Sequence, residues 1–384
     1  MRVGHFAQPL CQELKTGIGW YTYKLIYELI SSNIETEIYG FDFLNRNNGK
    51  KIIDNLFSDY KINTNYKCKI NPYILNGLYS RFDKFYSQIP FNSLFNSNVD
   101  IHHAHNYFLP YKLKSPSIVT IYDMVYKLYP ETMDYRNLEL LKKIMPRSIT
   151  ESTKILTISE NSKKEIIEIL NVNPNKISIA YPGYDKNEFK VITDNSITQS
   201  LKKLNLNKPF IFYLGTLEPR KNLERVIKAY ASIGSHIKTH DLVLAGSIGW
   251  KSESLFKLIE HYKLQDNIKI LGYISQTEKV ALYNKATCFI FPSIYEGFGM
   301  PVLEAMACGC PVITSNTSSL PEVVGKAGLM VDPYNIDEIS SSISRLINDS
   351  SLQQSFRILG LEQANKFKWK NTANSVIDLY KSIK

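Results

Sequence analysis

The sequence predicts an α/β protein with two domains, each built on a parallel sheet that is covered by helices. Short runs rich in β-branched residues alternate with amphipathic segments along most of the 384 residues, a pattern typical of strand–helix–strand units. The alternation stops after Pro182 and restarts near Pro209. Since a chain of this length usually forms domains of roughly 100–200 residues, we expect one domain at residues 1–190 and another at 191–369.

The expected strands form two series separated by a polar stretch that runs through Lys203 with little periodicity. In the first domain they are RVGHF (2–6), TEIYGFD (36–42), VDIHHAH (99–105), SIVTIYD (117–123) and KILTIS (154–159). In the second domain they are PFIFYLG (209–215), DLVLAG (241–246), NIKILGY (267–273), TCFIFPS (287–293), CPVITS (310–315) and GLMVD (328–332).

Helices are expected where caps or apolar stripes occur between these strands. Ser162 and Glu165 have the spacing of a capping box, which predicts that a helix begins there. The apolar residues from Leu223 to Tyr230 recur on one helical face and predict a helix from about Asn222. A last amphipathic helix is expected over residues 371–383.

The composition is that of a folded protein, with 44% hydrophobic and 21% charged residues. A net charge of +10 suits phosphorylated ligands, anionic lipid or nucleic acid. No nucleic-acid-binding motif accompanies the charge, so we expect no nucleic-acid partner. The five cysteines are scattered without zinc-like spacing, and neither a signal peptide nor a long apolar run is evident. We therefore expect a cytoplasmic protein with reduced thiols.

The most informative stretch runs from Phe291 to Gly325 and joins a strand, a glycine loop and a helix start. Gly297 and Gly299 allow the backbone to approach a ligand closely. The helix expected to begin near Met300 directs unpaired amides and the positive end of its dipole toward an anion. This combination predicts a seat for a diphosphate.

Glu296 and Glu304 flank this helix start, with seven residues between them. Carboxylates accept hydrogen bonds from pairs of hydroxyl groups, such as those of a sugar or a ribose. The alternative is that Glu296 complements the helix dipole and Glu304 lies on the helix surface. Both interpretations stay open at this point.

A second stretch, Phe212 to Tyr230, places Arg220 and Lys221 at the start of a helix. Two cations there oppose the helix dipole by some 0.3–1 kcal/mol each, and such a departure from local preference often marks a site. Both cations could neutralise the charge of a diphosphate leaving group. The alternative is that they point into solvent.

A third stretch contains Gly17 and Gly19, which open an amphipathic helix. A nicotinamide-cofactor site is disfavoured, because Thr22 stands where its fingerprint has a third glycine. A glycine loop at the end of a strand can still approach a phosphate or a sugar, or it can be a turn of packing value only.

Polar residues also follow two strands of the first domain. Strand alternation places His103 and His105 on one face and His102 on the other. Without an acidic or cysteine ligand nearby in sequence, we expect no metal site and predict that His105 lines a cleft. Tyr122 and Asp123 end another strand at the edge where open parallel sheets bind ligands; the alternative is that Asp123 caps a turn.

With these residues in view, the sequence resembles the retaining GT-B glycosyltransferases of family 4, which include mannosyl- and rhamnosyltransferases of bacterial polysaccharide assembly. The element from Glu296 to Glu304 with the following PVITSN strand carries the resemblance, and the GTLEPRKN loop reinforces it. The resemblance implies two Rossmann-like domains that face each other across a cleft. The first would bind the acceptor, the second would bind the nucleotide sugar, and the C-terminal helix at about 370–384 would return to the first domain.

The resemblance also implies roles for the site residues. Arg220 and Lys221 would contact the diphosphate and, with Glu296, would carry catalysis. Glu304 would bind the ribose hydroxyls. The other donor-binding residues that it implies are Gly297, Phe298 and Gly299 at the sugar, Gly272, Tyr273 and Ile274 at the base, and Gly17 and Gly19 in the loop of the first domain. The acceptor or cleft residues are His105 and Asp123.

One departure concerns Tyr122, because the family often has His-Asp where this chain has Tyr122-Asp123. The histidine usually contacts the donor sugar, so Tyr122 is predicted to replace it through its phenol. The chain also contains no Asp-x-Asp pair, and we expect no metal cofactor.

The resulting hypothesis is transfer of a hexose, with mannose from GDP-mannose as the first expectation, to a glycan or lipid-linked acceptor in surface polysaccharide synthesis. The resemblance implies retention by a front-face reaction. The alternatives are a nucleotide-sugar epimerase or phosphorylase on the same fold, and a non-catalytic nucleotide-sugar-binding protein. The segment 75–95 mixes aromatic and basic residues and would either contact an anionic membrane or pack as an ordinary helix and loop.

Overall fold

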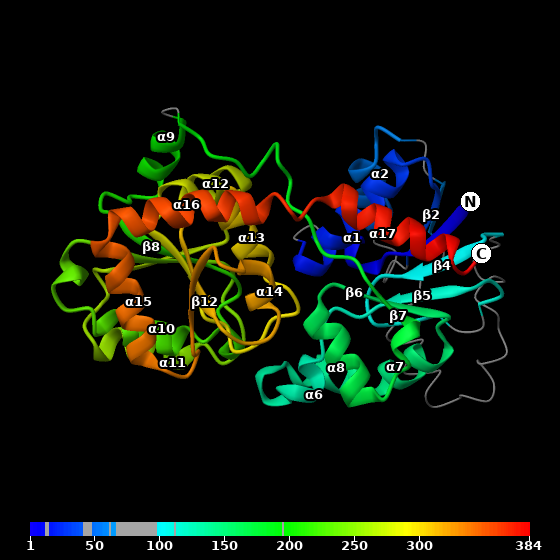
Figure 1. Cartoon of the computed structure of the whole chain (residues 1–384), viewed down its shortest axis with the longest axis horizontal. Coiled ribbons are helices and arrows are strands. Elements are labelled where there is room, and N and C mark those ends of the chain that lie inside the picture. Colours follow the sequence, from blue (N-terminus) through cyan, green and yellow to red (C-terminus); the bar gives the residue numbers. More distant parts are fainter. Residues whose placement is uncertain (12–14, 41–47, 61–62, 67–97, 111–112, 194–195) are drawn as a thin grey trace. The chain divides into compact units, whose positions relative to one another are not determined.

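The chain forms two compact α/β units in the computed structural model, which describes residues 1–11, 15–40, 48–60, 63–66, 98–110, 113–193 and 196–384 (Figure 1). The first unit comprises Met1–Leu128, Tyr135–Gly183 and Trp369–Lys384. The second comprises Tyr129–Asp134 and Tyr184–Lys368. The acceptor and donor roles expected for the two domains stay predictions.

The first unit is built on a seven-stranded sheet in the order β3-β2-β1-β4-β5-β6-β7, and all paired strands are parallel. Its strands are β1 (Arg2–Phe6), β2 (Glu35–Gly40), β3 (Asn63–Tyr66), β4 (Ile101–Ala104), β5 (Ser117–Thr120), β6 (Lys154–Thr157) and β7 (Ile177–Ile179). Residues of β4 and β5 are buried throughout, as expected for parallel strands that are covered on both faces.

The helices of the first unit connect these strands and cover the sheet. Within the described residues they are α1 (Gly17–Ser31), α2 (Asn48–Leu56), α6 (Val125–Leu128), α7 (Tyr135–Glu151), α8 (Glu160–Leu170) and α17 (Trp369–Lys381), with short 3-10 turns at η1 (Gln8–Cys11) and η3 (Pro174–Lys176). The last helix, α17, packs against α1. Its Tyr380 is fully buried and lies 2.7 Å from Nδ1 of His103 in β4.

The second unit has a six-stranded parallel sheet in the order β10-β9-β8-β11-β12-β13. Its strands are β8 (Phe210–Leu214), β9 (Asp241–Ala245), β10 (Ile268–Gly272), β11 (Cys288–Phe291), β12 (Val312–Ser315) and β13 (Gly328–Val331). The order reverses between β8 and β11, which lie side by side although β9 and β10 separate them in sequence. Ligands of open parallel sheets commonly bind at such a reversal, outside the carboxyl ends of the strands.

Helices cover both faces of this second sheet (Figure 1). They are α9 (Ser196–Lys203), α10 (Leu223–Ala231), α11 (Glu253–His261), α12 (Gln276–Lys285), α13 (Met300–Ala307), α14 (Leu320–Val324), α15 (Ile336–Asn348) and α16 (Ser350–Ala364). Short 3-10 turns occur at η2 (Pro130–Thr132), η4 (Pro219–Lys221) and η5 (Gly234–Lys238).

Three details of the structure differ from the sequence-based expectations. Helix α8 begins earlier than predicted, because Ser159 is its N-cap and accepts a hydrogen bond from the amide of Ser162. The polar stretch through Lys203 contains helix α9, whose Ile197 is buried. Strands β3 and β7 were not predicted, since NTNY is polar and ISI has only three residues.

Two expectations concern contact between the chain and a membrane. The stretch 75–95, for which a membrane contact was considered, lies outside the described residues. Among the helices that the structure describes, none combines the length and the apolar character needed to cross a membrane.

Candidate active site

The loop after β8 is held in place by Asn222, which adopts a left-handed backbone conformation at the start of α10. Its side chain is buried and donates hydrogen bonds to the carbonyl oxygens of Pro292, at 3.0 Å, and Pro333, at 2.6 Å. Pro292 directly follows β11. Asn222 therefore ties the loop after β8 to the loop after β11, at the point where the strand order reverses.

Arg220 and Lys221 both contact the carboxylate of Glu296 across this junction. Lys221 Nζ lies 2.6 Å from Oε1 of Glu296, and Arg220 Nη1 lies 3.2 Å from Oε2. Arg220 Nη1 also donates to the carbonyl oxygen of Tyr295 at 2.6 Å. The predicted cations thus point toward the predicted glycine loop and not into solvent, since their side chains are only 19% and 12% exposed.

Glu218 completes this group and was not predicted from the sequence. Its Oε1 lies 2.6 Å from Nη2 of Arg220, and its side chain is 5% exposed. The guanidinium of Arg220 is therefore held between two carboxylates, those of Glu218 and Glu296. The sequence position of Glu218, two residues before Arg220, could have identified it. A cation at a helix start is unfavourable, and a nearby carboxylate offsets this.

The Glu296 loop is fixed through its backbone by the segment that follows β12. The amide of Glu296 donates to Oγ of Ser318 at 3.0 Å. Ser319 Oγ donates to the carbonyl oxygens of Glu296 and Phe298, at 2.9 and 3.0 Å. Both serines lie in the SNTSS stretch, whose function was not predicted. Side-chain hydroxyls that bind backbone groups in this way stabilise irregular loops.

The charges of this cluster shift the pKa values of its members. Burial alone raises the pKa of the Glu296 carboxyl, but the positive charges of Lys221 and Arg220 outweigh it and hold the pKa below its usual value. Burial, aided by the neighbouring Arg220, lowers the pKa of Lys221, and Glu296 and Glu218 partly offset this. The cluster therefore favours an ionised Glu296.

Helix α13 begins directly after the glycine loop at Gly299. This residue has φ +111°, a left-handed value that glycine adopts without strain. A Cβ atom at Gly299 would lie 2.6 Å from Cδ2 of Leu320. Both the backbone angle and the close approach require glycine here. The start of an eight-residue helix with its positive dipole end is thereby brought next to the Glu296 loop.

Glu304 lies in the second turn of α13 and forms a separate ion pair. Lys279 Nζ of α12 lies 3.1 Å from Oε2 of Glu304, and the Tyr283 hydroxyl donates to the same oxygen at 3.2 Å. The residue is 9% exposed, so the alternative of an exposed helix-surface residue is disfavoured. Burial raises the pKa of the Glu304 carboxyl, and the Lys279 charge only partly offsets this. Lys279 and Tyr283 were not predicted.

The turn after β10 contains the residues expected near a base. Gly272 has φ +67°, and its carbonyl oxygen accepts a hydrogen bond from the amide of Gly246 at 2.7 Å. Tyr273 is 66% exposed, whereas Ile274 is buried. The turn therefore presents an aromatic ring to the surface of the second unit.

Comparison with known proteins identifies the family. Residues 15–188 match the family described as Glycosyltransferase Family 4, and residues 196–362 match the one described as Glycosyl transferases group 1. The chain is 34% identical to O-antigen chain mannosyltransferase B of Escherichia coli over 285 residues, which cover 74% of each protein. The chain belongs to glycosyltransferase family 4.

Other relatives of this glycosyltransferase agree in family and in fold. The serotype-specific mannosyltransferase WbdA of Escherichia coli is 34% identical over 229 residues, which cover 58% of this chain and 28% of WbdA. Among solved structures, sucrose-phosphate synthase from Thermosynechococcus elongatus has a TM-score of 0.75 at 17% identity, covering 99% of this chain and 98% of that one. Anabaena Alr3699/HepE, solved in complex with UDP and glucose, has a TM-score of 0.74 at 16% identity and full coverage of both chains. The fold is accordingly GT-B, with two Rossmann-like domains.

In the first unit of the glycosyltransferase, Gly17 and Gly19 lie in the first turn of α1. A Cβ atom at Gly17 would meet no atom within 4 Å, whereas one at Gly19 would lie 3.2 Å from the Pro9 carbonyl oxygen. Gly17 therefore borders open space, as a ligand-contacting glycine requires. Gly19 is explained by close packing against the preceding turn.

Tyr122 and Asp123 are engaged within the first unit. The Tyr122 hydroxyl donates to the carbonyl oxygen of His105 at 2.9 Å, and the residue is 4% exposed. Oδ1 of Asp123 accepts a hydrogen bond from the amide of Val125 at 3.1 Å, so Asp123 caps the turn that leads into α6. These contacts favour packing and capping roles. The predicted contact of Tyr122 with a donor sugar gains no support from them.

His105 is fully buried beside His5 and His103, which does not favour its predicted place in a cleft. Nδ1 of His5 lies 2.8 Å from Nε2 of His105. In the described part of the chain, these three histidines are a group whose ring nitrogens lie close enough to hold a metal ion. However, both nitrogens of His103 have partners, Tyr380 and Thr120, and its ring stacks on that of His105 at 4.0 Å.

The chemistry of this histidine group fits a packed polar core better than a metal site. Nε2 of His105 already has Nδ1 of His5 as its partner, so a metal ion would have to displace this contact and those of His103 with Tyr380 and Thr120. Burial lowers the pKa of His5 to about 3 and that of His103 well below its usual value. The histidines are therefore neutral near pH 7. They join β1 and β4 to α17 through the Tyr380 hydroxyl.

Proposed function

We propose that this glycosyltransferase moves a hexosyl group, with mannosyl from GDP-mannose as the first candidate, from a nucleotide sugar to a hydroxyl of a glycan or lipid-linked acceptor in surface polysaccharide synthesis. The observation that carries the donor part is the convergence of Arg220 and Lys221 on the Glu296 loop. The mannosyl part is supported by relatives named as an O-antigen chain mannosyltransferase and as a serotype-specific mannosyltransferase. A net charge of +10 suits an anionic membrane surface that carries the acceptor.

The second unit supplies the groups that bind the donor in this proposal. Arg220 and Lys221 bind the diphosphate, together with backbone amides at the start of α13. Glu296 holds hydroxyls of the donor sugar, and Gly297 and Gly299 let the loop approach it. Glu304 accepts hydrogen bonds from the ribose hydroxyls. The exposed Tyr273 ring beside Gly272 and Ile274 stacks on the base.

The reaction follows from where charge develops. The bond between the anomeric carbon and the phosphate oxygen breaks, and the acceptor oxygen bonds to that carbon on the same face. The acceptor proton passes to the leaving phosphate oxygen. Negative charge grows on the diphosphate as this happens, and Arg220 and Lys221 stabilise it. One such preorganised contact typically contributes about 3–4 kcal/mol to lowering the barrier.

The proposal needs no metal ion for this charge stabilisation. Two cationic side chains contact the carboxylate of Glu296, four residues before α13 begins at Met300. The sequence has no Asp-x-Asp pair, a pattern that would supply metal-ligating carboxylates. Transfer is therefore expected to continue in excess chelator, and a complete loss that added Mg²⁺ or Mn²⁺ restores would overturn this part.

The experiment that tests the proposal measures the slow hydrolysis of radiolabelled GDP-mannose, UDP-glucose and dTDP-rhamnose by the purified full chain without acceptor. One donor is expected to be hydrolysed, and a mannose oligosaccharide is expected to receive the sugar with the donor's anomeric configuration, read by NMR. An epimerised nucleotide sugar, formed from donor alone, would instead indicate an epimerase. Binding of donor without hydrolysis or transfer across an acceptor panel would overturn the enzymatic function.

A further inference from the structure

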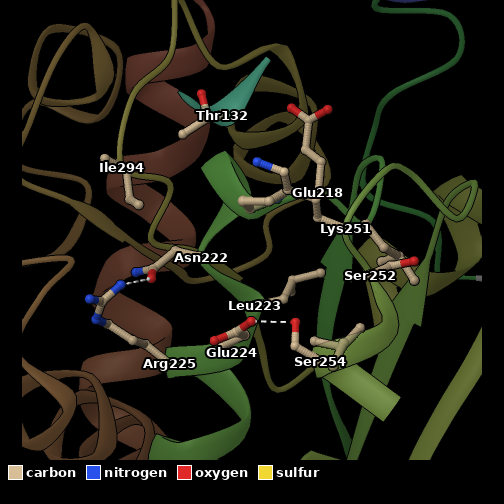
Figure 2. Close-up of a pocket in the computed structure, with 13 residues that line it drawn as sticks. Thr132, Glu218, Asn222, Leu223, Glu224, Arg225, Lys251, Ser252, Ser254 and Ile294 are labelled. Carbon is tan, nitrogen blue, oxygen red and sulfur yellow. Dashed lines mark hydrogen bonds between the residues drawn. The ribbon is translucent and has the colours of Figure 1, made fainter. Parts of the chain in front are cut away.

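A pocket of about 210 Å³ lies in the second unit, next to the loop that carries Arg220 (Figure 2). Three stretches of chain line it. Residues 217–219 and 222–225 come from the loop after β8 and the start of α10, and residues 251–255 come from the loop before α11 and its first turn. Thr132 comes from the short segment Tyr129–Asp134, and Ile294 completes the lining.

The pocket has a buried part and a polar mouth. Leu217, Asn222 and Leu255 of its lining are buried. Glu224 and Ser254 are exposed at its mouth, where the Ser254 hydroxyl donates to Oε1 of Glu224 (Figure 2). A ligand that enters from this side would meet polar groups first and aliphatic side chains below them.

The wall formed by Thr132 is firmly attached to the rest of the unit. The indole Nε1 of Trp250 donates to the carbonyl oxygen of Thr132 at 2.9 Å, and Lys251 Nζ donates to that of Glu131 at 3.1 Å. The ring of Tyr129 lies 5.3 Å from that of Tyr295, the residue that precedes Glu296. The shape of the pocket is therefore set before any ligand binds, which lowers the entropy cost of binding.

The lining matches the chemistry of a neutral sugar ring. Glu218 uses Oε1 for Arg220, and Glu224 uses Oε1 for Ser254. Since an ionised carboxylate offers about four acceptor sites, each retains capacity for hydroxyl donors. Two acidic and two basic side chains balance in charge, namely Glu218, Glu224, Arg225 and Lys251. This balance favours a neutral polyol over an anion such as phosphate.

The apolar lining residues and the size of the pocket also favour a neutral sugar ring as its ligand. Leu217, Leu223 and Leu255 can pack against the C–H faces of a ring while the carboxylates accept its hydroxyls. A volume of about 210 Å³ is below the ~300–1,000 Å³ that drug-sized ligands occupy, and it suits a single pyranose. We propose that this pocket is a carbohydrate-binding subsite that holds one pyranose unit, separate from the donor site.

The ligand has two possible sources with the same chemistry, a residue of the acceptor glycan or a free monosaccharide. Only the first source rests on the proposed transferase function. In either case the bound ring lies against Glu218, whose other oxygen holds Arg220. Occupancy of the pocket is thus linked to the position of a cation of the candidate active site through one side chain.

The test is saturation-transfer difference NMR on the full chain with methyl α-pyranosides of mannose, glucose, galactose and rhamnose. At least one should bind to the wild type with a millimolar Kd. Ser254→Phe, which fills the mouth, should weaken binding at least about tenfold. The matched control is Ser351→Phe, because Ser351 is an exposed residue at the same second position of helix α16.

Further measurements separate the outcomes. If circular dichroism shows that Ser254→Phe is unfolded, Glu224→Ala replaces it and should also weaken binding. A mannose oligosaccharide as acceptor identifies the source: its KM rises in Ser254→Phe if the pocket holds an acceptor residue, and stays unchanged if the ligand is a free monosaccharide. No binding of any pyranoside to the wild type, or equal binding to the mouth variants, overturns the subsite. A wild type that binds a pyranoside but transfers no sugar leaves the subsite standing and overturns the proposed function alone.

Discussion

The carboxylate of Glu296 lies 2.6 Å from Nζ of Lys221, although 75 residues separate them in the chain. The contact follows from the sheet order, because β8 and β11 are adjacent parallel strands and their carboxyl ends meet at one edge. Each strand delivers one loop to that edge. The cationic loop and the glycine loop are therefore joined by the same topology that reverses the strand order.

Lys221→Ala is predicted to lower kcat of transfer by about 100- to 1,000-fold, the usual effect of removing one preorganised charge contact. It should also lower the free energy of unfolding, by up to about 3–5 kcal/mol, because Glu296 loses a buried partner. Steady-state kinetics and urea unfolding measure the two effects. The matched control is Lys164→Ala, since Lys164 is 72% exposed and pairs with Glu168 only at 3.9 Å. An unchanged kcat in Lys221→Ala contradicts the assigned role.

Glu296→Gln and Glu304→Gln are predicted to have opposite pH dependences of stability. The pKa of Glu296 is lowered in the folded chain. Its ionised form therefore stabilises the fold at pH values above the usual pKa of 4.5, and this stabilisation is lost as pH falls through the pKa of the folded state. The stability deficit of Glu296→Gln should therefore be largest near pH 7 and shrink below 4.5.

For Glu304 the pH dependence of stability has the opposite sign, because burial raises the pKa of its carboxyl. The protonated form is favoured in the folded chain, so the wild type loses stability as pH rises from 4.5 through the folded pKa. Glu304→Gln cannot ionise, and its stability relative to the wild type should increase over that range. Urea unfolding at a series of pH values measures both variants. Parallel curves for the two would show that the environments of the carboxylates do not differ as described.

Gly299→Ala is predicted to lower the free energy of unfolding by about 1–3 kcal/mol, the range for a strained left-handed residue, with a further contribution from the contact with Leu320. The distorted loop should also raise KM for the donor. Gly360→Ala is the control. Gly360 lies inside α16, and a Cβ atom there would lie 3.5 Å from Met306, which is an ordinary van der Waals distance. That change should stabilise the protein by about 0.4–1 kcal/mol. Equal melting temperatures for the two variants would contradict the local geometry.

Tyr122→Phe is predicted to reduce stability by about 0.5–1.5 kcal/mol, the net value of a typical hydrogen bond, because the hydroxyl donates to the buried carbonyl of His105. Its effect on kcat should be much smaller than that of Lys221→Ala. Thermal unfolding and transfer kinetics on the same preparation decide the point. A loss of kcat as large as that of Lys221→Ala, with stability preserved, would instead favour the predicted contact between the phenol and the donor sugar.

Much of the fold could be predicted from the sequence because many of its strands, such as β5, β8 and β11, are short apolar runs whose residues are mostly buried. Runs such as FIFYL in β8 and CFIF in β11 stand out from their polar surroundings, as parallel strands do. The helix at Leu223 was predicted for a similar reason, since its buried stripe has helical spacing. Elements without such a contrast were missed, including β3, β7 and α9, because pairing and packing with distant partners stabilise them.

Some features of the candidate site likewise follow from residues that are neighbours in the sequence, and others depend on contacts between distant residues. The sequence by itself determined the two-domain α/β class, the glycine loop before α13 and the presence of two cations where a helix begins. Each of these features depends on residues that are close together in the sequence. Only the tertiary structure decided that Arg220 lies between Glu218 and Glu296, that Glu304 faces Lys279, and that Tyr122 turns inward to His105. Those contacts depend on the order of strands in the sheets and on the balance between burial and charge, which residue spacing does not encode.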